Sequence, residues 1–122
     1  MTVEALLFLF LLLHVKHVIV DWYWQTPYEL QNKMTFGHLG GIQHAGKNAI
    51  GTGLCLLPFF GVYGMILGII VDFYVHYNID YMKSNITYSL NLTTDDRSFW
   101  HLIGLDQFLH FVTYILIIYI LI

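Results

Sequence analysis

The sequence predicts an all-α fold, an integral membrane bundle of four helices. Of its 122 residues, 57% are hydrophobic and only 11% are charged, whereas soluble domains carry about 25% charged residues. The apolar residues gather in long segments separated by short polar stretches. A chain of this composition lacks the polar surface that a soluble domain needs, so we expect a single transmembrane domain, residues 1–122, surrounded by the lipid bilayer.

The first predicted helix covers residues 3–24. It exceeds the ~20 apolar residues that a membrane-spanning helix needs. Trp22, Tyr23 and Trp24 near its end suit the membrane–water interface, where amphipathic rings settle. The segment lacks the basic start and the cleavage site of a signal peptide, so we expect a retained helix. Pro27 ends it, and the polar stretch that follows suits a short interfacial helix and a loop.

The second and third predicted helices cover residues 44–57 and 60–83, with Pro58 between them. A single helix over the whole apolar stretch would be about 58 Å long at ~1.5 Å per residue. That length is nearly twice the ~30 Å of a bilayer core. We therefore expect a short second helix, a turn at Pro58 and a full-length third helix.

The fourth predicted helix covers residues 99–122 and follows a polar loop. Asp95 and Asp96 lie just before it, where acidic side chains satisfy the free N–H groups of a helix start. An even number of helices places both termini on one side of the membrane. The Lys and Arg residues near the two longer loops then predict that these loops are cytoplasmic and that the termini lie outside: Lys33, Lys47, Lys83 and Arg97.

Pairs of His and Asp one helical turn apart are the main functional signal. Residues at this spacing share one face of a helix. Ionisable groups inside a membrane are costly and therefore mark functional sites. In an up-and-down bundle the pairs, together with His44 at the start of the second helix, converge on one layer near one end. The pairs are His17 with Asp21, His76 with Asp80, and Asp106 with His110.

Imidazole and carboxylate groups are the usual ligands of Zn, Mn and Fe ions. The set exceeds what one tetrahedral ion needs, so it predicts one or two divalent ions, with either Asp80 or Asp106 as a general base. A metal would also offset the cost of burying the carboxylates. The alternative is that the pairs are interhelical hydrogen bonds that hold the bundle together. The predicted metal ligands are His17, Asp21, His44, His76, Asp80, Asp106 and His110.

Several other polar residues lie near this layer. His14 and Asp72 lie deeper on the same helix faces, as orienting groups or part of a proton path. Lys83 and Gln107 are placed to contact a substrate headgroup. Lys16 is expected to extend its charged end toward the membrane surface.

Gly64 and Gly68 form a small-x3-small pattern that permits close helix packing, within the chain or in a homo-oligomer. We expect His38 and His101 to be structural or solvated residues. The single cysteine, Cys55, has apolar neighbours and suits a small buried residue.

The ordered motifs resemble a bacterial and phage family of small membrane proteins described as a domain of unknown function. They run from His17-x3-Asp21 and its aromatic residues to Gln25, then Asn32-Lys33, His44, His76-x3-Asp80-x2-Lys83 and Asp106-Gln107-x2-His110. The family looks distantly like membrane-bound metal-dependent hydrolases. Relatives often carry a second His soon after the one that opens the second helix, but here Asn48 stands one turn after His44. The resemblance implies a bacterial cytoplasmic membrane and names no substrate.

The leading functional hypothesis is metal-dependent hydrolysis of a lipid or another membrane-associated ester or phosphoester. The first alternative is a transporter or channel for protons or metal ions, because intramembrane Asp/His chains relay protons. The second is a non-catalytic phage or bacterial membrane effector. No basic patch is present to neutralise phosphates, so no nucleic-acid partner is expected.

Overall fold

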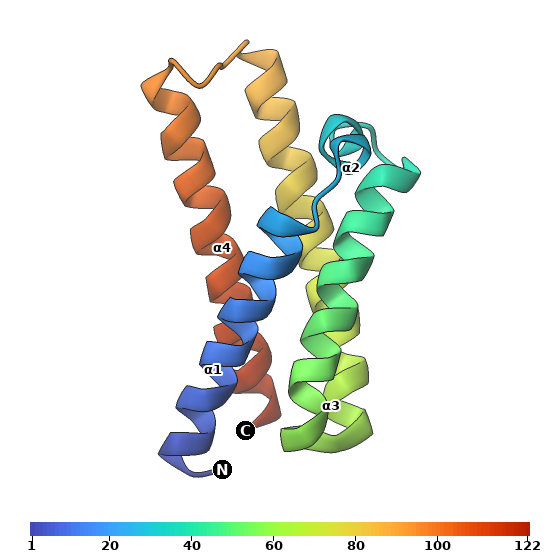
Figure 1. Ribbon diagram of the computed structural model, residues 1–122, viewed down its shortest axis with the longest axis vertical. Coiled ribbons are helices and arrows are strands. Elements are labelled where there is room, and N and C mark those ends of the chain that lie inside the picture. The colour runs from blue at the N-terminus through green and yellow to red at the C-terminus, as the bar shows by residue number, and fades with distance from the viewer.

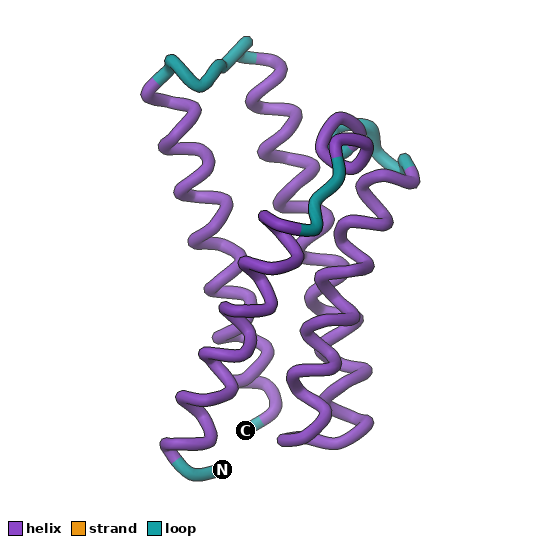
Figure 2. Tube along the Cα trace, viewed as in Figure 1, coloured by secondary structure: helices purple, strands orange, loops and turns teal.

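The computed structural model describes residues 1–122, and every regular element in it is a helix. Figure 2 shows helices joined by short loops, with no strand. The all-α prediction is therefore confirmed. The elements are α1 (Val3–Val18), η1 (Ile19–Tyr23), α2 (Pro27–Asn32), α3 (Leu39–Ser89) and α4 (Arg97–Leu121).

The first membrane helix consists of α1 and the π-helical turn η1 that continues it. At its start, the Thr2 hydroxyl accepts a hydrogen bond of 3.2 Å from the Ala5 N–H. At its end, the Trp24 N–H bonds the Ile19 carbonyl at 2.9 Å, one residue farther back than in an α-helix. Asp21 lies within this wider turn. Turns of this kind often occur at functional sites because they change the direction in which a side chain points.

The short helix expected after the first membrane helix is present as α2, and its position at the membrane interface stays a prediction. Thr26 and Glu29 form a reciprocal capping box, and Pro27 occupies the first helical position. The element packs against α3. Figure 1 shows α2 at the end of the bundle away from the chain termini.

α3 is a helical hairpin rather than one rod, and its reversal lies at Gly61. Gly61 has φ 63° and ψ −162°, a conformation that is open essentially only to glycine. The prediction placed this turn at Pro58. Pro58 instead lies within the helix, because a proline removes one backbone hydrogen bond but does not reverse the chain. The first arm also begins at Leu39, ahead of His44, so the second helix is longer than expected.

The two arms of α3, together with α1 and α4, form an up-and-down bundle (Figure 1). Both termini and the Gly61 reversal lie at one end, as an even number of passes requires. The helices Val3–Tyr23, Leu39–Ser89 and Arg97–Leu121 are long and apolar enough to cross a membrane. This is the arrangement expected of an integral membrane protein.

The interior has an apolar half and a polar half. The apolar core lies toward the termini and consists of Leu9, Leu13, Leu56, Tyr114, Ile117 and Ile118. Buried polar and charged side chains nonetheless outnumber buried hydrophobic ones, while large hydrophobic side chains cover the outside. Since the solvent of a membrane protein is lipid, the polar and charged side chains gather inside the bundle.

The glycines of the second α3 arm contact the chain's own side chains. A Cβ at Gly64 would meet Phe60, and one at Gly68 would meet Leu56 and Thr52. These positions therefore let the two arms of α3 approach closely. The homo-oligomer through Gly64 and Gly68 stays a prediction.

Candidate metal centre

The predicted polar layer forms where four membrane helices meet. Asp21 comes from η1, while the other members come from both α3 arms and from α4. None of the six side chains is more than 7% exposed. The layer unites Asp21, His44, His76, Asp80, Asp106 and His110.

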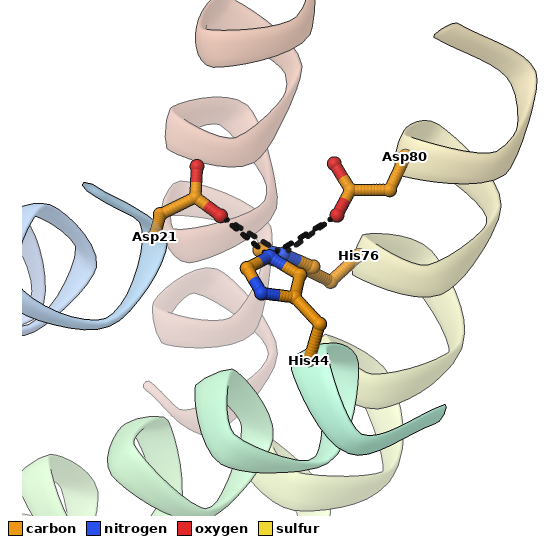
Figure 3. Close-up of side chains that lie close together, drawn as sticks. All are labelled: Asp21, His44, His76 and Asp80. Carbon is orange, nitrogen blue, oxygen red and sulfur yellow. Dashed lines mark hydrogen bonds and ion pairs between the residues drawn. The ribbon is translucent and has the colours of Figure 1, made fainter. Parts of the chain in front are cut away.

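The first candidate group consists of Asp21, His44, His76 and Asp80, whose ligand atoms lie within 4.8 Å of one another. The Nε2 atom of His44 lies 2.7 Å from Asp21 Oδ1 and 3.2 Å from Asp80 Oδ2. The Nε2 atom of His76 lies 3.5 Å and 3.4 Å from the same two oxygens. Figure 3 shows the two imidazoles between the two carboxylates. Two nitrogen and two oxygen donors suit a divalent transition metal.

The second candidate group consists of Asp80, Asp106 and His110, so Asp80 belongs to both. The Nε2 atom of His110 lies 3.6 Å from Asp80 Oδ1 and 3.7 Å from Asp106 Oδ2. The rings of His76 and His110 stack with their centroids 4.1 Å apart. The two groups are therefore adjacent, and each oxygen of Asp80 faces one of them.

Several converging ligand atoms are buried without a hydrogen-bond partner. They include the Nε2 atoms of His76 and His110 and the Oδ1 atom of Asp106. Buried polar atoms are normally paired, because an unpaired one loses its hydration without compensation. The oxygens nearest to the two imidazoles lie at 3.4–3.7 Å, beyond ordinary hydrogen-bond distance. Such spacing between a carboxylate and an imidazole suits a cation between them.

Two lysines face the carboxylates from the loop side. The Nζ atom of Lys33 lies 2.8 Å from Asp80 Oδ2, and only 3% of Lys33 is exposed. The Nζ atom of Lys83 lies 4.0 Å from Asp106 Oδ1. The sequence analysis used Lys33 as a loop charge and as part of the Asn32-Lys33 motif, and it did not predict that Lys33 is buried beside Asp80.

Gln107 connects the two groups from α4. Its Nε2 atom donates to Asp21 Oδ2 at 3.2 Å and to Asp106 Oδ2 at 3.0 Å. Its Oε1 atom lies 2.9 Å from His17 Nε2. The other ring nitrogen of His17, Nδ1, lies 2.9 Å from the hydroxyl of Tyr114. His17 thus lies beside the two groups, with both nitrogens engaged in hydrogen bonds.

Lys16 is buried, so the prediction that it extends to the membrane surface is wrong. Its Nζ atom lies 3.5 Å from Asp72 Oδ2 and donates to the Tyr114 hydroxyl at 2.8 Å and to the Asn48 carbonyl at 3.2 Å. The Thr52 hydroxyl donates to Asp72 Oδ2 at 2.6 Å. Because Asp72 compensates its charge, the Lys16 ammonium group can be buried without contact with water. Asp72 therefore neutralises a buried charge below the metal groups.

The remaining histidines lie outside the two groups. His14 bonds the Phe10 carbonyl of its own helix through Nδ1 at 2.7 Å, rather than a member of the layer. His38 caps α3 by accepting the Gly40 N–H at 3.1 Å, and His101 is exposed on α4. The structural role expected for His38 agrees with its position, whereas His101 is exposed and forms no side-chain hydrogen bond.

Glu29 and Asn48 both contact His44. The sequence analysis did not predict the contact between Glu29 and His44. A Glu29 oxygen lies 3.6 Å from His44 Nδ1, and the Asn48 amide lies 3.4 Å from His44 Nε2. Burial alone would raise the pKa of Glu29, but hydrogen bonds from Lys47 and the Thr26 amide lower it below its ordinary value. Its capping-box spacing could have indicated Glu29 as a helix residue, but not its contact with the site.

A groove of about 620 Å³ lies above the second group, between α2, the end of α3 and the start of α4. Its lining is half apolar and includes Leu30, Met34 and Phe99. Lys83 is part of the same lining, and its Nζ atom is the one that faces Asp106. The groove therefore ends beside the second candidate group.

The comparisons with known proteins give a family but no activity. No curated protein and no solved structure matches the chain, so the distant likeness to metal-dependent hydrolases stays a prediction. A family model described as "Protein of unknown function (DUF3307)" matches residues 6–122. That match covers the helices, the polar layer and the groove. The chain therefore belongs to the DUF3307 family.

Proposed function

We propose that this protein holds two divalent metal ions inside the membrane and hydrolyses a lipid or another membrane-associated ester or phosphoester. The main support is that buried imidazole and carboxylate atoms, several of them without a hydrogen-bond partner, converge in two groups that share Asp80. The setting is a bacterial cytoplasmic membrane with α2 and the groove on the cytoplasmic side, as the positions of Lys and Arg favour.

The donor set indicates how the residues divide the work. Nitrogen and oxygen ligands suit Zn, Mn or Fe, and such ions polarise an ester oxygen and activate water. Asp80 joins the two sites because its oxygens face both. Asp106 is the better general base, since its Oδ1 atom is unpaired and lies on the side of Lys83.

The groove supports a substrate with an apolar part and an anionic head. Its apolar side chains would hold the former, while Lys83 would bind the latter next to Asp106. Lys83 thus keeps the substrate-contacting role expected from sequence. Gln107 holds carboxylates instead, which favours an orienting role.

The apolar half of the bundle favours hydrolysis over transport. A proton or ion path has to cross the whole membrane, but Leu9, Leu13, Leu56 and Ile117 are fully buried between the polar layer and the termini. These side chains offer no group that carries a proton.

Metal stoichiometry tests the two-site proposal. Asp21→Asn and His110→Gln each change only one group, so each should lose one ion. Asp80→Asn should lose both, because Asp80 belongs to both groups. Elemental analysis of the detergent-purified protein measures the ions, with His101→Gln on the same helix as the control. A parent protein without metal after supplementation with Zn or Mn would refute the proposal.

Activity is tested separately on the metal-loaded protein with lipid and phosphoester substrates. Lys83→Met should raise KM for anionic substrates at unchanged metal content. Asp106→Asn should lower kcat, and its metal content is measured alongside because Asp106 also belongs to the second group. If the protein retains both ions but hydrolyses none of these substrates, the hydrolase activity is refuted and the metal-binding part of the proposal stands.

A further inference from the structure

A continuous series of hydrogen bonds leads from Lys16, below the polar layer, to two carboxylates of the metal groups. Lys16 bonds the Tyr114 hydroxyl, and this hydroxyl bonds His17 Nδ1. His17 Nε2 bonds Gln107 Oε1, and the Gln107 amide bonds Asp21 and Asp106. The series crosses from α1 to α4 twice.

The direction of every bond in this series follows from its two ends. An ammonium group only donates, so the oxygen of Tyr114 accepts from Lys16 and its proton is free to go to His17 Nδ1. The carboxylates of Asp21 and Asp106 only accept, so Gln107 turns its NH₂ group toward them. Gln107 Oε1 must then accept from His17 Nε2. Both ends assign the same direction, and His17 carries its proton on Nε2.

Other proton arrangements of His17 interrupt the series at Tyr114. If His17 carried a proton on Nδ1, the Tyr114 hydroxyl would accept from both Lys16 and His17, and its own proton would have to turn to the Thr52 hydroxyl, outside the series. A doubly protonated His17 would do the same and would add a charge near Lys16. The three donors of Lys16 are also fully used, by Asn48, Asp72 and Tyr114.

We propose that Lys16 and Tyr114 hold the proton of His17 on Nε2, and that His17 orients the carboxylates of the two candidate groups through Gln107 instead of binding metal. Gln107 occupies the Oδ2 atoms of Asp21 and Asp106. The Oδ1 atom of Asp21 therefore faces His44 and His76. The Oδ1 atom of Asp106 has no hydrogen-bond partner. His17, Tyr114 and Lys16 are positioning residues in this scheme. The consequence for metal binding rests on the proposed function, but the hydrogen-bond series itself does not.

The proton position is measured first, in the metal-free protein. Nitrogen NMR of protein labelled with ¹⁵N-histidine separates a protonated from an unprotonated ring nitrogen, and His17→Leu identifies the His17 signals. We expect a protonated Nε2 and an unprotonated Nδ1. A proton on Nδ1, or on both nitrogens, would overturn the proposal without touching the metal assignment.

Metal affinity then distinguishes orientation from ligation. Loss of an outer hydrogen-bond partner weakens metal binding by about 10–100-fold, whereas loss of a ligand removes an ion. We expect His17→Leu and Tyr114→Phe each to weaken binding within that range while both ions still bind at saturation. Because both act through one series, the double variant should bind no more weakly than His17→Leu alone.

Thr113→Val is the matched control. Thr113 neighbours Tyr114, is buried, and bonds only the Leu109 carbonyl of its own helix. In the double variant with His17→Leu, the fold-changes in metal affinity of the two substitutions should multiply. Loss of an ion in His17→Leu, or multiplying effects of His17→Leu and Tyr114→Phe, would overturn the proposal. A parent that binds no metal would refute the metal centre, and the NMR result would still decide the proton position.

Discussion

At the scale of single residues, the buried lysines distinguish this site from a simple cluster of metal ligands. Lys33 and Lys16 each meet one buried carboxylate, Asp80 and Asp72 respectively. Removing one partner of a buried ion pair leaves an uncompensated charge. Lys33 therefore holds the charge of Asp80 in the absence of an ion.

Lys33→Met should destabilise the metal-free protein by about 3–5 kcal/mol, because Asp80 loses its nearest cation. Added Zn or Mn should restore more stability in this variant than in the parent, since the ion neutralises the same carboxylate. Thermal unfolding in detergent, with and without metal, measures both effects.

Lys47→Met is the control for this comparison. Lys47 also pairs with a carboxylate, that of Glu29, but a third of its side chain is exposed. Exposed pairs contribute about 0–1 kcal/mol. Equal destabilisation by the two substitutions would contradict the assignment of Lys33 to the site.

The sequence predicted that the His/Asp pairs converge, but it did not show the residues that support them, and His17 lies beside the two candidate groups rather than in them. His76 with Asp80 and Asp106 with His110 are visible as pairs because the spacing of one helical turn is local. The partners of Lys16 lie on other helices, so no local spacing shows them. A lone lysine in an apolar helix then suggests exposure at the membrane surface, and only the fold shows that Asp72 makes burial possible.

At the scale of elements, the hairpin of α3 depends on one backbone conformation. The positive φ of Gly61 reverses the chain, and a Cβ there would meet no other atom within 4 Å. The demand for glycine is therefore conformational and not steric. The sequence predicted a turn in this region from the length of the apolar stretch. Proline was the more visible signal, but the torsion angles of the turn require the glycine that follows.

Gly61→Ala should destabilise the protein by about 1–3 kcal/mol, the cost of this backbone region for a residue with a side chain. Gly46→Ala should stabilise it by about 0.5–1 kcal/mol, because Gly46 lies in a regular helix where a Cβ also meets nothing. Unfolding of the two variants in mixed detergent compares them directly. A neutral Gly61→Ala would show that the reversal is not held at this residue.

At the scale of the whole molecule, the bundle places all the chemistry at one end. The termini and the reversal within α3 mark the opposite end (Figure 1). The number of helices and their order could be predicted from sequence because the apolar segments are long and separate. The side of the membrane on which each end lies depends on a few basic residues and stays a prediction.

Single cysteines test the arrangement across the membrane. In a Cys55→Ser background, cysteines replace the exposed residues Thr2, Phe36 and Thr94. With a membrane-impermeant thiol reagent on intact cells, we expect labelling at position 2 only, and labelling at 36 and 94 after lysis. Labelling of 2 and 94 from the same side would contradict the bundle. A reversed pattern would keep the bundle and invert its orientation.

The Lys16–Asp72 pair also has a consequence for how the protein is made. A ribosome synthesises Lys16 well before Asp72, so the first helix enters the membrane with its lysine unneutralised. A lysine at the centre of a helix costs about 2.5–3.5 kcal/mol on insertion, which the mean hydropathy of 2.1 in this segment offsets. Lipid tails solvate leucine as well as another helix does, so apolar contacts alone give little reason to associate. The unpaired lysine supplies that reason: Asp72 neutralises it when the second arm of the hairpin inserts, and Tyr114 completes its hydrogen bonds when α4 follows.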